Sequence, residues 1–175
     1  MFEAIAIAVA VLLAAVLGFA ATKPDIFRVQ RATSIKAPPG RIFPLIINLH
    51  RWEPWSPWEK VDPAMKRTFS GAENGKGAVY EWEGNRKVGT GRMEITDTSA
   101  PSKVIIKLDF ITPFEGHNIA EFTLEAKGDS TDVTWTMYGP CPYKMKIMHV
   151  FMNMEKMVGK QFQTGLTNLK VIAEN

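Results

Sequence analysis

The sequence predicts an α+β domain in which a curved antiparallel sheet of about seven strands wraps a long C-terminal helix, preceded by one N-terminal transmembrane helix. Three observations predict this arrangement. An unbroken apolar run opens the chain, short alternating segments separated by turn residues fill its middle, and a long segment with helical spacing closes it. The length of 175 residues suits one such domain and is short for two.

The first element is the apolar run, which covers the 18 residues from Ala4 to Ala21. As a helix it would be about 27 Å long, close to the roughly 30 Å of a bilayer's hydrocarbon core. A domain of this size has no interior that could bury a helix that is apolar on every side. We therefore expect a transmembrane anchor at 1–22, a linker at 23–27 and a folded domain at 28–175.

A cleaved signal peptide is the alternative interpretation of residues 1–22. The segment lacks a basic n-region and its apolar run is longer than a typical h-region, but Gly18 to Ala21 are small enough for cleavage. Basic residues that follow a span keep that flank in the cytoplasm. Four of them are present: Lys23, Arg28, Arg31 and Lys36. We expect a single-pass protein of the cell membrane with a cytoplasmic domain; export after signal cleavage remains the alternative.

The next elements are strands and one short helix. Alternation predicts a first strand over Arg28–Lys36, and apolar residues at helical spacing predict a helix over Arg41–Leu49. Turn residues then separate six further strands: about Met65–Ser70, Ala78–Gly84, Lys87–Asp97, Lys103–Ile111, Asn118–Ala126 and Asp132–Tyr138. Because the connections have hairpin length, these strands should form an antiparallel meander.

The last element is predicted to be one long helix. Tyr143 to Ala173 contain no proline, and their apolar residues recur in steps of three and four, with any bend expected near Gly159 or Gly165. Its apolar stripe is the only surface long enough to cover the dry face of the sheet. Met145, Met148 and Met152 lie off that stripe, so they belong either to the core or to a patch that faces lipid beside the anchor.

A strongly curved sheet around one helix leaves a hollow that side chains fill poorly. We expect apolar and aromatic residues of the inner faces to line a ligand pocket there: Tyr80, Trp82, Met93, Ile106, Leu108, Phe110, Phe122, Val133, Trp135, Met137, Phe151, Met154 and Val158. Three further rings, Trp52, Trp55 and Trp58, should either cap the core or line the pocket mouth. An interior that is simply packed is the alternative.

Several segments of the sequence resemble one superfamily. They are Ile35 to Phe43, Trp52 to Trp58, Tyr80 to Asn85, Gly89 to Ile95, Asp132 to Trp135 and Gly165 to Lys170. Together they resemble the START-like (SRPBCC) helix-grip superfamily, and more narrowly its polyketide cyclase/dehydrase and lipid-transport branch, over residues 28 to 173. The resemblance implies a cavity for a hydrophobic ligand. It does not decide activity, because fold alone never does.

The sequence offers no recognisable catalytic, cofactor-binding or metal-binding set. His50, His117 and His149 lack the spacing of metal ligands, and the single Cys141 excludes an intramolecular disulfide. On the inner faces from the third strand onward, Tyr80 and the indole N–H groups are the only polar groups. We therefore expect no catalytic residue, no cofactor and no metal.

A few polar groups remain that could orient a ligand without reacting with it. They are Tyr80, Trp82, Trp135 and either Arg67 or His149. A buried ionisable group facing the cavity would favour an enzyme over a passive binding protein.

The sequence therefore predicts a membrane-tethered binding or carrier protein for a hydrophobic small molecule or lipid, without catalysis. One alternative is an enzyme similar to polyketide cyclases and dehydratases, and another is an interaction module with a filled core. The expected partners are the apolar ligand and the bilayer. Nucleic acid is not expected, because the net charge is only +3 and no run of Lys or Arg exceeds two.

Overall fold

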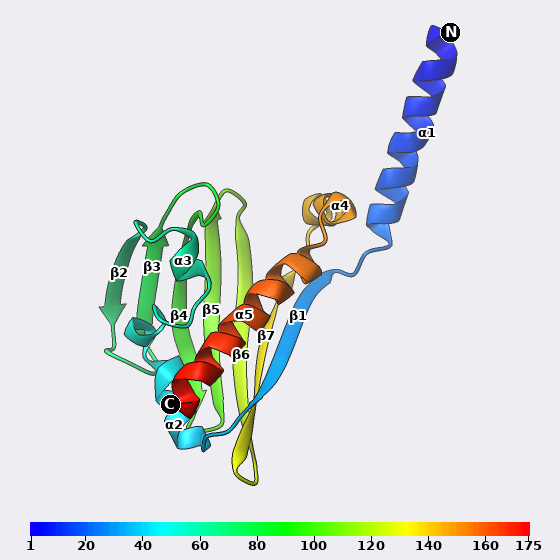
Figure 1. Ribbon diagram of the computed structural model, residues 1–175. Coiled ribbons are helices and arrows are strands. Elements are labelled where there is room, and N and C mark those ends of the chain that lie inside the picture. Colours follow the sequence, from blue (N-terminus) through cyan, green and yellow to red (C-terminus); the bar gives the residue numbers. More distant parts are fainter.

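The computed structural model describes residues 1–175 and contains one sheet and five α-helices. Figure 1 shows the sheet curving around helix α5, while α1 projects away from the domain. The helices are α1 (Phe2–Ala21), α2 (Pro39–Ile47), the 3-10 turn η1 (Leu49–Arg51), α3 (Trp58–Val61), α4 (Tyr143–Phe151) and α5 (Met154–Glu174). The strands are β1 (Ile26–Ile35), β2 (Lys66–Gly71), β3 (Ala78–Glu83), β4 (Thr90–Ser99), β5 (Lys103–Thr112), β6 (Gly116–Lys127) and β7 (Ser130–Pro140).

The seven strands form one antiparallel sheet in the order β1-β7-β6-β5-β4-β3-β2. Strands β2 to β7 follow each other as a meander, and β1 pairs with β7 along its whole length, from Ile26 opposite Pro140 to Ile35 opposite Thr131. A register shift between Ile95 and Asp97 adds a bulge to β4. Bulges increase the twist and bend a strand, which helps this sheet to curve. The predicted fold class, with seven antiparallel strands around the C-terminal helix, is confirmed.

The concave face of the sheet packs on α5. Phe162, Leu166 and Leu169 of α5 are almost completely buried, as the spacing of three and four predicts for the inner stripe. The ring of Trp135 on β7 stacks on that of Phe162 with centroids 4.1 Å apart. Helix α2 begins with Pro39, whose missing amide hydrogen costs little at that position, and buries Ile42 at one end of the same core.

The prediction of a single helix from Tyr143 to Ala173 is wrong. The helix stops at Phe151, Met152 has an extended backbone, and α5 begins at Met154. The cause is Asn153, whose side chain accepts a hydrogen bond from the Lys156 amide at 2.9 Å and so caps a new helix start. The break frees α4 to leave the sheet and pack against α1, as Figure 1 shows.

Helix α1 contributes nothing to the core of the domain. It is long and apolar enough to cross a membrane, and Ala20 is its only buried residue. By length and composition alone, such a helix is compatible with a membrane anchor and with a signal sequence.

The close contact between β3 and β4 gives a stability prediction. A methyl group on Gly91 would overlap the Trp82 ring and the Asp109 carbonyl oxygen, whereas one on Gly40, in the first turn of α2, meets nothing. Gly91→Ala should therefore lower the free energy of unfolding by about 1–3 kcal/mol, the usual cost of overpacking. Gly40→Ala, the control, should be neutral or stabilising by up to about 1 kcal/mol. Chemical denaturation of both full-length variants in detergent measures the free energy of unfolding. Equal stability of Gly91→Ala and wild type would contradict the close packing of Gly91 against Trp82.

Candidate ligand-binding cavity

A cavity of about 300 Å³ lies between the concave face of the sheet and the helices α3, α4 and α5. Of the 29 residues that line it, 20 are hydrophobic. Small-molecule sites of this apolar character span roughly 300–1,000 Å³, so the cavity falls at the small end of that range. The interior of the domain is therefore not filled by its own side chains.

Most of the side chains predicted to line a pocket do line this cavity. They are Tyr80, Trp82, Met93, Ile106, Leu108, Phe110, Trp135, Met137, Met154 and Val158. The strand residues among them come from β3, β4, β5 and β7, where alternation places every second side chain on the concave face. Met154 and Val158 lie one turn apart at the start of α5.

Three predicted pocket residues lie elsewhere. Phe122 and Val133 are fully buried in the solid part of the core, where Phe122 stacks on Trp135 at 4.8 Å. Phe151 is 73% exposed, because the break after α4 turns the end of that helix outward. The alternation of strand residues placed Phe122 and Val133 correctly on the concave face. It does not show which part of that face is covered by packed side chains and which part lines the cavity.

The tryptophan cluster lies at the buried side of the cavity and not at its mouth. Trp55 is fully buried and does not line the cavity, while Trp52 and Trp58 form part of its wall. The indole N–H groups of Trp52 and Trp55 donate to the carbonyls of Ile46 and Leu45, at 2.9 and 3.2 Å. These bonds fix both rings against α2, an arrangement that agrees with the first of the two interpretations of this cluster, a cap on the core.

The mouth lies where lining residues are exposed. Four exposed residues line the cavity here: Thr112 at the end of β5, Pro113 and Phe114 in the connection between β5 and β6, and Lys87 before β4. Met145 and Met148 of α4 line the same cavity and are partly buried. The cavity thus opens between the β5–β6 connection and α4.

The cavity wall contains a buried carboxylate that the sequence analysis missed. Glu59 on α3 lines the cavity, and only 6% of its side chain is exposed. Its two oxygens accept hydrogen bonds from the Tyr80 hydroxyl at 2.7 Å and from the Arg67 Nε at 2.6 Å. Burial, and then the charge and hydrogen bond of Glu59, raise the pKa of Tyr80 far above its usual value. The sequence analysis named polar groups only on the inner faces of the strands; Glu59 adds a carboxylate from α3.

Strand alternation could not find Glu59, because this residue lies in a helical turn after the tryptophan cluster. Of the two residues considered as alternatives for orienting a ligand, Arg67 and His149, Arg67 is not part of the wall, whereas His149 is. Arg67 instead holds Glu59 and donates a second bond to the Met65 carbonyl at 2.9 Å. Both carboxylate oxygens are thus engaged by protein donors.

A second polar group lies nearer the mouth. His149 lines the cavity, its ring packs against Phe27, and its Nδ1 lies 3.6 Å from the Cys141 sulfur. Burial lowers the pKa of His149, with the charge of Lys23 acting in the same direction, and burial raises the pKa of the Cys141 thiol. A protonated thiol can donate to Nδ1, which leaves the proton of the neutral ring on Nε2. That buried nitrogen has no partner in the protein.

The other two histidines lie outside the cavity. His50 stacks on Phe69 with centroids 3.9 Å apart, and the Nδ1 of His117 lies 2.7 Å from an Asp109 oxygen on the exposed face of the sheet. No three His, Cys, Asp or Glu side chains come together as metal ligands.

The two histidines should titrate on opposite sides of the ordinary value of about 6.5. The hydrogen bond to Asp109 raises the pKa of His117, so that pair is intact at low pH and weakens as the pH rises through the raised pKa. His149 should titrate below 6.5, since burial disfavours its charged form. NMR titration of the full chain in detergent, assigned with His117→Gln, measures both; a His149 that titrates at or above the ordinary value would contradict the buried position.

Solved structures share this fold at low sequence identity. A protein from Chromobacterium violaceum is 14% identical with a TM-score of 0.60, over 87% of this chain and 99% of that chain. The Aha1 dimer from Colwellia psychrerythraea is 17% identical with a TM-score of 0.61, over 85% and 96%. Major latex-like protein 151 from Panax ginseng is 14% identical with a TM-score of 0.57, over 87% and 100%. These identities establish the fold alone.

A sequence family matches nearly the whole domain. Its description is polyketide cyclase / dehydrase and lipid transport, and it covers residues 27–174. No curated protein matches the chain significantly. The match begins at the start of β1 and ends in the last turn of α5, so it takes in every element that forms the cavity. The chain therefore belongs to the polyketide cyclase/dehydrase and lipid transport family of helix-grip proteins.

Proposed function

We propose that this protein binds or carries a hydrophobic small molecule or lipid, without chemical conversion, at the surface of the membrane that holds its N-terminal helix. The observation that carries the proposal is the apolar cavity between the sheet and α5. A packed interaction module would have filled this space, because natural cores leave few voids larger than a water molecule.

The cavity walls suit a ligand that is mostly apolar with a few polar atoms. Burial of about ten CH₂ groups would contribute about 8 kcal/mol, which is comparable with the roughly 4–15 kcal/mol that association costs. Hydrogen bonds to the ligand therefore decide whether binding is tight. The free Nε2 of His149 is one group that supports such a bond.

The proposed tether is α1. Residues 1–22 would span the bilayer, 23–27 would link it to the ligand-binding domain at 28–175, and the basic residues that follow α1 favour a cytoplasmic domain. Export after signal cleavage is the competing placement. An anchor keeps the cavity beside a reservoir of apolar molecules, which suits a carrier.

The second candidate function is an enzyme of the polyketide cyclase or dehydratase type, and Glu59 is the observation that favours it. A general acid or base must exchange a proton with its substrate. Here both oxygens of Glu59 accept hydrogen bonds from protein groups, and the raised pKa of Tyr80 keeps the phenol protonated at neutral pH. Because Arg67 and Tyr80 already use both oxygens of Glu59, the carboxylate has no free oxygen for a substrate proton, and we place binding ahead of catalysis.

Filling the cavity should abolish binding. Ala120 on β6 lines the cavity, so Ala120→Phe would occupy it with a ring, whereas Ala126→Phe places the same ring on an exposed position of the same strand. Native mass spectrometry of the detergent-extracted full chain, with lipidomics of the released molecules, should find an apolar species at near one per chain in wild type and Ala126→Phe. Ala120→Phe, checked for folding by circular dichroism, should lose it. A wild-type protein that binds nothing from a lipid extract would contradict the proposal.

Glu59→Gln separates binding from catalysis. The change should cost stability, because it leaves Arg67 without its carboxylate; the loss should be about 1–3 kcal/mol, less than for a fully buried pair since a quarter of the Arg67 side chain is exposed. We expect wild type and Glu59→Gln to return the bound molecule chemically unchanged after prolonged incubation, as judged by mass spectrometry. Conversion by wild type that Glu59→Gln abolishes would establish the enzyme instead.

A further inference from the structure

The mouth of the cavity carries an unusual set of exposed apolar side chains. Phe114, in the β5–β6 connection, lines the opening and is 60% exposed. Phe151 and Met152, at the end of α4, are 73% and 41% exposed, and Met145 and Met148 of the same helix line the cavity. We name Phe114, Phe151 and Met152 the mouth patch. Isolated exposed apolar residues are ordinary, but exposed apolar residues on the elements that border the opening of an apolar cavity favour an interaction surface.

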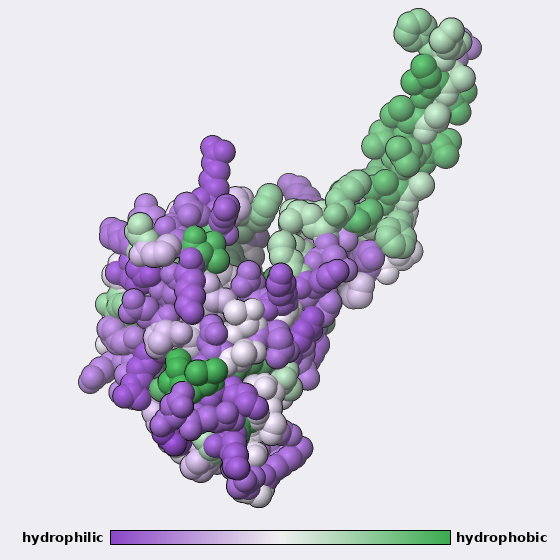
Figure 2. All heavy atoms as spheres, viewed as in Figure 1, coloured by the Kyte–Doolittle hydropathy of each residue, from purple (hydrophilic) through white to green (hydrophobic).

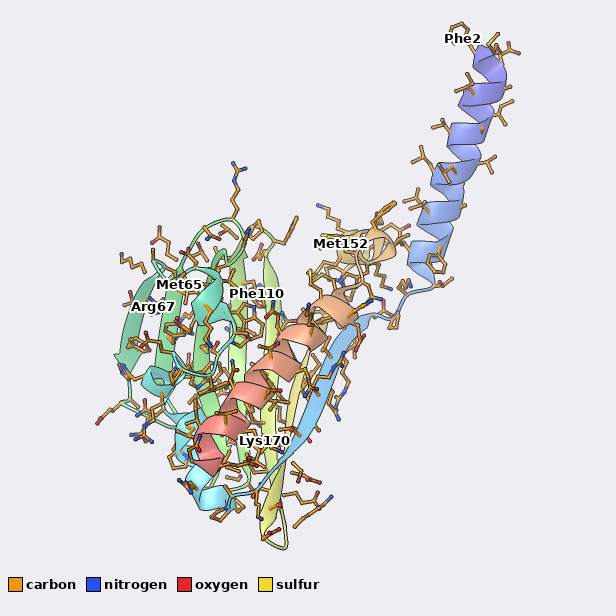
Figure 3. All side chains as sticks on the ribbon, viewed as in Figure 1. Phe2, Met65, Arg67, Phe110, Met152 and Lys170 are labelled. Atoms are coloured by element: carbon orange, nitrogen blue, oxygen red, sulfur yellow. The ribbon has the colours of Figure 1, made fainter.

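The mouth patch lies at the same end of the domain as α1. The Tyr143 hydroxyl of α4 donates to the Leu17 carbonyl of α1 at 2.9 Å. Figure 2 shows the apolar surface of α1 continuing onto the adjoining part of the domain. In Figure 3, Met152 lies beside the base of α1, whereas Lys170 lies toward the other end of α5.

The connection between α1 and the domain is short and fixed. Only residues 22–25 separate α1 from β1, and four residues can span at most about 14 Å. Asp25 is held at two points: its carbonyl accepts from the Cys141 amide at 2.7 Å, and its carboxylate pairs with the buried Lys146 of α4 at 2.6 Å. The domain therefore cannot turn its mouth far away from the end of α1.

These constraints define where α4 lies if α1 spans a bilayer. The 20 residues of α1 make a helix of about 30 Å, which matches the hydrocarbon core. Tyr143 contacts the last turns of that helix, so α4 lies at the boundary between lipid chains and headgroups, where tyrosine is favoured. The exposed basic residues at this end, Arg86, Lys87 and Lys144, suit an anionic headgroup layer.

We propose that the mouth patch docks on the bilayer that α1 spans, so that the cavity opens directly toward lipid. An apolar molecule would then move between bilayer and cavity without crossing water. This inference rests on the proposed function only in taking α1 as an anchor. It adds which surface of the domain meets the membrane and through which opening the ligand passes.

The test measures the depth of single positions in the bilayer. Three full-length variants, Phe114→Cys, Phe151→Cys and Asp129→Cys, are labelled with an environment-sensitive fluorophore and reconstituted in vesicles of phosphatidylethanolamine and phosphatidylglycerol. Asp129 is the matched control, since its side chain is exposed in the β6–β7 turn, at the other end of β6 from the mouth. The native Cys141 is buried, and labelled wild type gives its background.

We expect spin-labelled lipid to quench at least half of the emission at positions 114 and 151 and almost none at 129. Equal, weak quenching at all three positions, in protein that floats with the vesicles, would overturn the docking and leave the binding proposal intact. Quenching at 114 and 151 that is lost as the protein-to-lipid ratio rises would overturn it as well, in favour of contact between two copies. Protein that does not float with vesicles would instead refute the anchor.

Discussion

The stack of three aromatic rings around Trp135 determines how the rest of the domain is arranged. Trp135 on β7 lies between Phe122 on β6 and Phe162 on α5, with centroids 4.8 and 4.1 Å away, and so fixes the helix on the concave face of the sheet. Trp55 and Trp58 pack edge-on against the same ring. Trp58, Trp135 and Phe162 form one wall of the cavity, which lies between this aromatic stack and the start of α5. There the helix breaks at Asn153 and α4 departs toward α1, which leaves the cavity.

The chemistry of the cavity follows from its walls. Apolar side chains supply most of the surface. Among the polar groups that interrupt it, Glu59 and Tyr80 are hydrogen-bonded within the protein, while His149 and Trp135 each keep one buried nitrogen unpaired. A buried carboxylate would be costly without its partners, and here Arg67 and Tyr80 supply them. The arrangement suits a ligand that is held by its apolar body and oriented by one hydrogen bond.

The sequence predicted the fold well because its signals are periodic. Alternation in β3 to β7 located both the strands and their inner face, and the resemblance to the helix-grip superfamily agrees with the family match. The site was predicted less completely. Glu59 lies in α3, a single helical turn that is too short to show hydrophobic periodicity. The break between α4 and α5 depends on one capping hydrogen bond to Asn153, within a stretch whose apolar spacing is otherwise regular. That break also explains why Phe151 was placed in the pocket. Trp55 is buried because it packs against α2, a contact that the alternation of strand residues cannot predict.

The central claim is that the hollow between the sheet and α5 holds an apolar molecule in the living cell. The most direct measurement is a high-resolution structure of the full chain extracted from its native membrane without added lipid. The account predicts continuous, elongated non-protein density between Trp82, Met137 and Val158, reaching toward His149 and the mouth. An interior in which those side chains have closed on each other, or one that holds only ordered water, would contradict it.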